Sequence, residues 1–217
     1  MKVLLVISFL LLSTIGWAEE ELFCFFIPPE KWEAVDPSKL NRYVRVGFAG
    51  KGSGNFRPTI NLAIENIGDS SLKSYLKAVK EIHESDKNTL WRDLGKFETA
   101  AGCAELTEIT TKTQLGELRL LQLILLHDKK AYLMTGGMPT EEFALHRAPI
   151  LKAFRSLTLT SNLFSTFPNL EKREKLEKAF ANLKEVGLNT FQQMVLEEGK
   201  EMGLHWQIVV LQEAEKK

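Results

Sequence analysis

Hydrophobic and polar residues alternate with a period of two in the first part of the chain, which is typical of half-buried β-strands. Val44, Val46 and Phe48 alternate with polar or small residues, and the same alternation returns over residues 60–64. The segment between these stretches, 50–57, is polar and rich in glycine. The pattern therefore predicts a β-hairpin with a long mobile loop.

Four further segments have the composition of strands. The first is an aromatic run that stops at Pro28-Pro29, because proline cannot donate a hydrogen bond to a strand ladder. The third is apolar at nearly every position, whereas a strand with one face in water would alternate. We therefore expect this strand to be covered on both faces. The four segments are 22–27, 102–111, 118–126 and 131–135.

Two stretches change to the period of an amphipathic helix. The first follows N-cap candidates at 69–71. The second has Thr140 as its expected N-cap, Glu141 and Glu142 in a first turn that favours acidic groups, and Pro149 as an expected kink. The apolar stripe of the first helix consists of Leu72, Tyr75, Leu76, Val79 and Ile82.

Gly136 and Gly137 lie between a predicted strand and the second helix, where a phosphate-binding loop would also lie. Such a loop needs several converging backbone N–H groups, as in G-x-x-x-x-G-K-[ST] or G-x-G-x-x-G. The sequence TGGMPTEEF has neither pattern, and Glu141 and Glu142 would repel an anion. We expect the glycines to end the strand and no nucleotide to bind there.

The last part of the chain, 160–217, has a helical pattern. One apolar stripe covers 170–186 and a second covers 191–209, with a break expected at 187–189. This favours a helical hairpin folded back on the preceding domain, and the alternatives are a free arm or a dimerising coiled coil. The sequence thus predicts a domain at 19–159 and a helical extension at 160–217.

The beginning of the chain has the pattern of a secretory signal peptide covering residues 1–18. A short cationic start with Lys2 is followed by an unbroken stretch of apolar and small residues. Gly16 and Ala18 then place small residues at positions −3 and −1 of a cleavage site before Glu19. The stretch is too short to span a bilayer as a stable helix. We expect cleavage near Ala18 and a soluble, exported protein in the periplasm or outside the cell, without an integral membrane span.

Cys24 and Cys103 are the only cysteines. In an oxidising compartment two cysteines can form a disulfide, which would stabilise the protein by closing a long loop. Two small thiols buried on separate strands are the alternative. The spacing between them matches no metal or redox motif.

Residues with ligand or catalytic chemistry are scattered. Lys+Arg and Asp+Glu number 28 each, so no overall field favours nucleic acid, and we expect none to bind. Glu142 and His146 have the i, i+4 spacing of metal ligands, but two ligands leave a zinc site incomplete, and an exposed pair on a helix face is the commoner arrangement. No G-x-S-x-G elbow or cysteine–histidine signature is present. The sequence assigns no catalytic, cofactor-binding or metal residues and no cofactor, and we expect no enzymatic activity.

The order of elements is distinctive. An aromatic strand stopped by proline (FFIPPEKW) precedes a hairpin whose second strand begins RPTINLAIEN, and an amphipathic helix (SLKSYLKAVKEI) precedes three strands (AGCAELTEITT, LRLLQLILL, KAYLMTGG). The closing helix, FALHRAPILKAFRSL, ends with Leu151, Phe154 and Ser156. In this order the chain resembles the PsbP-like superfamily, which includes extrinsic photosystem proteins, a Ran-binding nucleotide-release factor and exported bacterial proteins. The resemblance covers about residues 22–159.

This resemblance implies an α+β fold with an antiparallel sheet between helices, to which the C-terminal helices are an addition. It also implies a non-enzymatic function, since the members bind or assemble other proteins and some bind metal ions. We therefore expect an exported, non-catalytic binding or assembly protein of the cell envelope whose partner is another envelope protein. The extension or the 50–57 loop is the first expected contact surface. The alternative is a small-ligand or metal-ion binding module with a pocket between sheet and helices.

Overall fold

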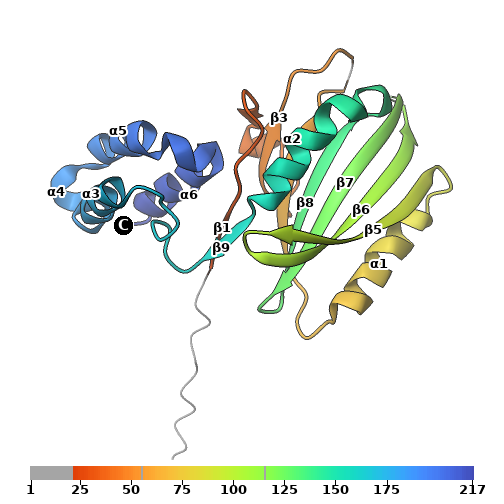
Figure 1. Cartoon of the computed structure of the whole chain (residues 1–217), viewed down its shortest axis with the longest axis horizontal. Helices are drawn as coiled ribbons and strands as arrows, with labels where there is room; N and C mark the ends of the chain where they lie inside the picture. The colour runs from red at the N-terminus through yellow and green to blue at the C-terminus, as the bar shows by residue number, and fades with distance from the viewer. Residues whose placement is uncertain (1–21, 55, 115) are drawn as a thin grey trace, which may run out of the picture.

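The computed structural model describes residues 22–54, 56–114 and 116–217, so the expected signal peptide and its cleavage site near Ala18 lie outside the described residues. The strands of the main sheet are β2 (Glu33–Ala34), β3 (Val44–Ala49), β4 (Thr59–Asn66), β5 (Thr89–Thr99), β6 (Gly102–Thr113), β7 (Gly116–His127) and β8 (Lys130–Pro139). They form one seven-stranded antiparallel sheet in the order β2-β3-β4-β8-β7-β6-β5 (Figure 1). A short 3-10 helix, η1 (Pro37–Lys39), lies between β2 and β3.

Helices cover both faces of this sheet. α1 (Leu72–Glu84) packs against Ile124, Ala131 and Leu133 on one face. α2 (Phe143–Arg155) packs on the other face, where the largest core lies. In β7, Leu123 belongs to the α2 side and Ile124 to the α1 side, so the strand is covered on both faces as its apolar sequence predicts. The expected α+β fold, an antiparallel sheet between helices, is confirmed.

The sequence predicted the N-cap region of α1 correctly and the N-cap of α2 wrongly. The Ser71 hydroxyl accepts a hydrogen bond from the Ser74 N–H and caps α1. Thr140, however, begins a 3-10 turn, η2 (Thr140–Glu142), and makes no capping bond. α2 follows this turn and continues through Pro149.

Gly136 and Gly137 lie within β8 and do not end it, contrary to the sequence prediction. A Cβ atom on Gly136 would lie 2.6 Å from the Ile150 Cγ2 of α2. The missing side chain therefore lets the helix lie directly on the strand. Gly136 therefore serves helix–sheet packing, whereas a Cβ atom on Gly137 would lie 3.1 Å from the Leu120 Cδ2 of β7.

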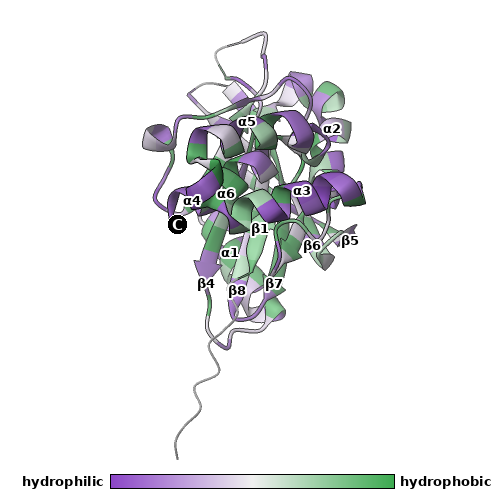
Figure 2. Cartoon of the chain, turned by 90° about the vertical axis from the view of Figure 1, so that its left-hand side faces the viewer, coloured by the Kyte–Doolittle hydropathy of each residue, from purple (hydrophilic) through white to green (hydrophobic). Residues whose placement is uncertain are grey.

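The C-terminal extension is helical, as expected, but more divided than a two-helix hairpin. Its helices are α3 (Leu170–Ala181), α4 (Leu183–Val186), α5 (Leu188–Glu198), η3 (Gly199–Met202) and α6 (Gly203–Glu215). They enclose a core of their own that includes Leu176, Phe191 and Trp206. In Figure 2, α3 is largely hydrophilic and α6 largely hydrophobic, in agreement with the burial of Trp206 and Val210 on α6.

Strand β1 (Phe23–Phe25) connects the extension to the sheet domain. It pairs with β9 (Thr158–Thr160), a strand that the sequence pattern did not predict. Phe23 and Phe25 pack in the core of the extension, whereas Cys24 and Phe26 pack in the core beneath α2. Because side chains alternate along a strand, one segment contributes to both cores. The extension is therefore folded back on the domain.

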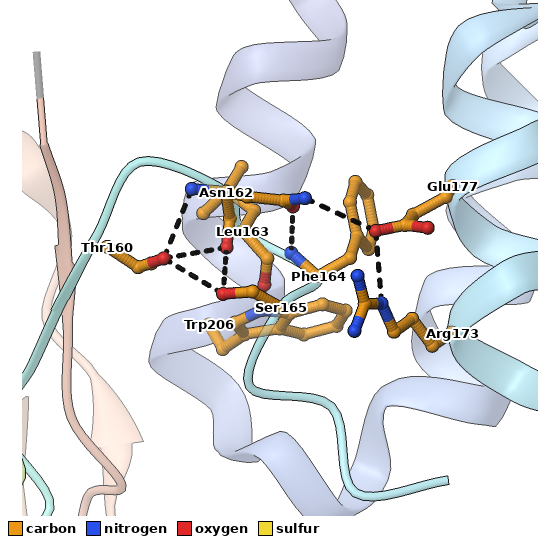
Figure 3. Close-up of polar contacts among 8 residues, drawn as sticks. All are labelled: Thr160, Asn162, Leu163, Phe164, Ser165, Arg173, Glu177 and Trp206. Atoms are coloured by element: carbon orange, nitrogen blue, oxygen red, sulfur yellow. Dashed lines mark hydrogen bonds and ion pairs between the residues drawn. The ribbon is translucent and has the colours of Figure 1, made fainter. Parts of the chain in front are cut away.

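Polar contacts fix the segment that leads into the extension (Figure 3). The Trp206 indole Nε1 donates a hydrogen bond of 2.7 Å to the Leu163 carbonyl oxygen. The Asn162 side-chain amide donates to Glu177, whose carboxylate also accepts from Arg173. The linker is thus bound to both α3 and α6.

Cys24 and Cys103 are free thiols in this structure, so the candidate disulfide is not formed. Cys24 is buried in the core beneath α2, and Ala104 belongs to the same core. Cys103, which precedes Ala104 in β6, is exposed. Its side chain points to the opposite face of the sheet, because successive residues of a strand alternate. The sheet itself therefore separates the two sulfur atoms.

Candidate functional site

An apolar groove lies between the segment 27–32 and the outer side of α2. Its volume is about 530 Å³, within the usual range for binding sites. Glu30, Lys152 and Ser156 are its polar residues, and the remaining lining is apolar. The apolar residues are Ile27, Pro28, Pro29, Trp32, Ala148, Pro149 and Ala153.

Backbone and side-chain contacts hold the two walls in place. The Ser156 hydroxyl accepts a hydrogen bond of 2.7 Å from the Ile27 N–H and donates one of 2.7 Å to the Ala153 carbonyl. Gly203, at the start of α6, lies against Ile27. Proline restricts the backbone of the segment after Ile27. The groove is therefore largely pre-formed.

A partly buried polar cluster lies next to the groove, at the start of α2. The Glu142 carboxylate accepts hydrogen bonds from the Ser53 N–H, at 2.8 Å, and from the Ser53 hydroxyl. The Nε2 atom of His146 lies 3.2 Å from the other Glu142 oxygen. The His146 ring packs edge-on against Trp32, with ring centroids 6.0 Å apart. Trp32 thus belongs both to the cluster and to the groove wall.

The hydrogen bonds from Ser53 hold the pKa of the Glu142 carboxyl below its usual value, and the bond with His146 adds to this effect. The Ser53 hydroxyl donates to the carboxylate and not to the imidazole. In a Ser–His–acid relay, the imidazole must lie between the hydroxyl and the acid so that it can accept the hydroxyl proton. Here the Glu142 carboxylate lies between the Ser53 hydroxyl and the His146 imidazole, so this arrangement does not pass the hydroxyl proton to His146.

The sequence identified the Glu142–His146 spacing but not its environment. The two residues are 9% and 8% exposed, so the expectation of an exposed pair on a helix face is wrong. Their further neighbours, Ser53 and Trp32, come from distant segments that spacing along the chain does not reveal. Among the residues that the structure describes, no three His, Cys, Asp or Glu side chains are arranged to hold a metal ion.

The 50–57 loop is attached to the rest of the domain at Ser53 and at Arg57. Ser53 is bonded to Glu142 on α2. The Arg57 guanidinium donates to the Gly50 carbonyl at 2.8 Å and to the Glu33 carboxylate at 3.2 Å. Composition predicted a mobile loop, but these contacts tie it to the start of α2 and to β2. A Cβ atom on Gly50 would lie 2.7 Å from the Trp32 ring, so the loop also lies against a residue of the groove wall.

Comparisons with known proteins give structural likenesses only. No family model matches the sequence, and no curated protein matches it. Among solved structures, LpqN of Mycobacterium tuberculosis, described as involved in cell envelope biogenesis, is 11% identical with a TM-score of 0.51, covering 67% of this chain and 87% of its own. The PsbP protein (CyanoP) of Synechocystis is 12% identical with a TM-score of 0.46, covering 69% of this chain and 99% of its own. The Ran-binding protein Mog1p of Saccharomyces cerevisiae is 12% identical with a TM-score of 0.43, and the match covers 62% of this chain and 89% of Mog1p.

The likeness to LpqN agrees with the α+β fold that the order of elements indicated. At such low identity it shows the fold alone. Within the described segments, none of the helices combines the length and hydrophobicity needed to cross a membrane.

Proposed function

We propose that this chain is an exported, non-catalytic binding protein of the cell envelope that holds an apolar segment of another protein in the α2 groove. The pre-formed apolar groove carries this proposal. The signal-peptide pattern supports export, and the description of LpqN as an envelope biogenesis protein is compatible with it. The arrangement of Ser53, Glu142 and His146, which lacks a proton relay, supports a binding role over catalysis.

The apolar surface extends beyond the groove, which favours a protein segment as its occupant. Leu145 is 70% exposed and lies one turn before Ala148 and Pro149, on the same face of α2. On the other wall, Ile27 is 45% exposed. Exposed apolar surface that continues on both sides of a groove is typical of protein-interaction sites.

Site-specific photocrosslinking tests this proposal. A photoreactive phenylalanine analogue at Ala148, which lines the groove, should give a discrete crosslinked protein in the native envelope. The matched control is the same analogue at Ala78, an exposed alanine on α1. Equal crosslinking from the two positions, or none from Ala148, would contradict the proposal. Amino-terminal sequencing of the purified protein checks export, with Glu19 as the expected first residue.

A small amphipathic ligand is the second candidate, because the groove has ligand-like volume and Lys152 at its lining. A ligand selective for the folded state raises the melting temperature. Fatty acids and divalent ions should be screened against the mature protein and an Ala148→Arg variant. A shift that the substitution abolishes would favour this candidate, whereas crosslinking without any shift would favour the protein partner.

A further inference from the structure

The edge strand β5 has an open outer side. It is the last strand of the main sheet, and within the described part of the chain only β6 pairs with it. None of its residues is buried. Over 90–99 the described residues provide no backbone hydrogen bond to its outer side. Unpaired N–H and C=O groups of this kind can pair with a further strand.

A β-bulge limits the regular part of this edge. The pairing of β5 with β6 shifts between Asp93 and Gly95, where Gly95 has φ +81° and its N–H donates to the Asp93 carboxylate at 2.8 Å. A bulge increases the local twist and interrupts pairing. A partner strand is therefore restricted to residues 89–93, a length that suits a short extended peptide. Within it, the Thr89 N–H already donates to the Asp86 carbonyl at 2.9 Å, so Thr89 offers a partner only its carbonyl oxygen.

The side chains along this segment specify the chemistry of a partner. Arg92 and Arg119 both contact the buried carboxylate of Glu108, with N–O distances of 3.2 and 3.7 Å. One carboxylate faces two guanidinium groups, which leaves a net positive charge. Arg92 is the accessible member, because its side chain is 66% exposed whereas that of Arg119 is 33% exposed.

Arg119 can balance Glu108 without Arg92. Its guanidinium carbon lies 4.3 Å from the centroid of the Phe143 ring on α2, which holds the group over the sheet. An exogenous carboxylate can therefore pair with Arg92 while Glu108 keeps a charged neighbour, so no buried charge is left alone.

Leu90 adds an apolar contact on the same face. It lies two residues before Arg92 on β5, so the two side chains point to the same side of the sheet. Leu90 is 73% exposed. On an added strand, residues directly opposite these positions would meet them as cross-strand pairs. An apolar residue and an acidic residue two positions apart would complement both.

We propose that residues 89–93 of β5 bind an extended segment of a protein partner, which adds an eighth strand to the sheet and places a carboxylate against Arg92 and an apolar side chain against Leu90. Backbone hydrogen bonds supply affinity in this mode of recognition, and the side-chain pairs supply specificity. This site is separate from the α2 groove and does not depend on the function proposed for it.

The test uses the full mature protein labelled with ¹⁵N and two blocked synthetic pentapeptides. Both are threonine-rich with valine at the fourth position, and they carry either glutamate or lysine at the second, so that an antiparallel peptide places these residues opposite Leu90 and Arg92. Titration should shift the backbone amide signals of 89–93, and bound glutamate peptide should slow hydrogen exchange there. The glutamate peptide should bind at least about tenfold more tightly than the lysine peptide.

Two variants of Arg92 and one matched control complete the test. Arg92→Gln should weaken binding of the glutamate peptide about tenfold, and Arg92→Glu should reverse the preference for the two peptides. Lys96→Glu makes the same charge reversal on β5 beyond the bulge and should leave the affinity unchanged. Equal binding of both peptides, an equal loss with Lys96→Glu, unchanged signals over 89–93, or pairing of β5 with a second copy of the chain would each overturn the proposal.

Discussion

Protonation of His205 should weaken the contact between the extension and the sheet domain. His205 is 3% exposed, and its Nδ1 atom accepts a hydrogen bond of 3.2 Å from the Phe26 N–H. Its ring centroid lies 4.8 Å from that of Phe26 and 6.0 Å from that of Phe48. Burial in this apolar environment lowers the pKa of His205 from 6.5 to about 3. A protonated Nδ1 could no longer accept the bond.

The direction and size of the effect follow from the two pKa values. Because the pKa is lower in the folded state than in the unfolded state, the unfolded chain takes up the proton first as the pH falls below about 6.5. The free energy of unfolding should therefore decrease by about 1.4 kcal/mol per pH unit from about pH 6.5 down to about pH 3. At pH 4.5 this amounts to about 3 kcal/mol. Above pH 6.5 the histidine contributes no pH dependence.

Urea unfolding between pH 7.5 and 4.5 measures this contribution. The wild type should be compared with His205→Asn, whose side-chain oxygen can still accept a hydrogen bond but does not titrate. His127→Asn is the control, because the His127 side chain is 44% exposed. The difference between wild type and His205→Asn should shrink as the pH falls, whereas His127→Asn should follow the wild type. A constant difference between wild type and His205→Asn across this range would refute the reasoning.

Three further substitutions or reactions test the packing. Gly136→Ala should lower the free energy of unfolding by about 1–3 kcal/mol, because the new methyl group would meet Ile150 at 2.6 Å. Gly54→Ala, which meets nothing within 4 Å, should change it by less than about 0.5 kcal/mol in the same urea experiment. A thiol reagent should label Cys103 in the folded protein and Cys24 only after denaturation. Protection of both thiols, or rapid labelling of both, would contradict the placement of the two cysteines on opposite sides of the sheet.

The sequence predicted those elements in which one periodicity persists. The stripe from Leu72 to Val79 and the alternation around Val46 and Phe48 each lie on a core and keep one phase. Ile82, which the sequence also placed in the stripe, is 71% exposed. β5 was missed because the bulge between Asp93 and Gly95 shifts the phase of its alternation. In an edge strand with no buried residue, the two faces also differ little in hydrophobicity, and the prediction of strands from alternation depends on that difference.

Only part of the candidate site could be predicted from the sequence. Pro28-Pro29 was interpreted correctly as the end of a strand, but nothing in the pattern places these prolines beside α2, more than a hundred positions later. The Glu142–His146 spacing was identified, yet its hydrogen-bond donor, Ser53, lies 89 residues away. Grooves and polar clusters depend on tertiary contacts between segments, whereas periodicity reports only how each segment faces the core.

The extension restricts which surfaces can receive a partner and how this can be tested. Phe23 and Phe25 of β1 pack in the core of the extension, and the bond between Phe26 and His205 crosses the boundary. A chain ended near residue 159 would expose these aromatic side chains and leave the Phe26 N–H without its acceptor. Loss of binding in such a chain would therefore report loss of structure as readily as loss of a contact surface. Point substitutions on α2 and β5, which leave β1 between its two cores, separate these effects.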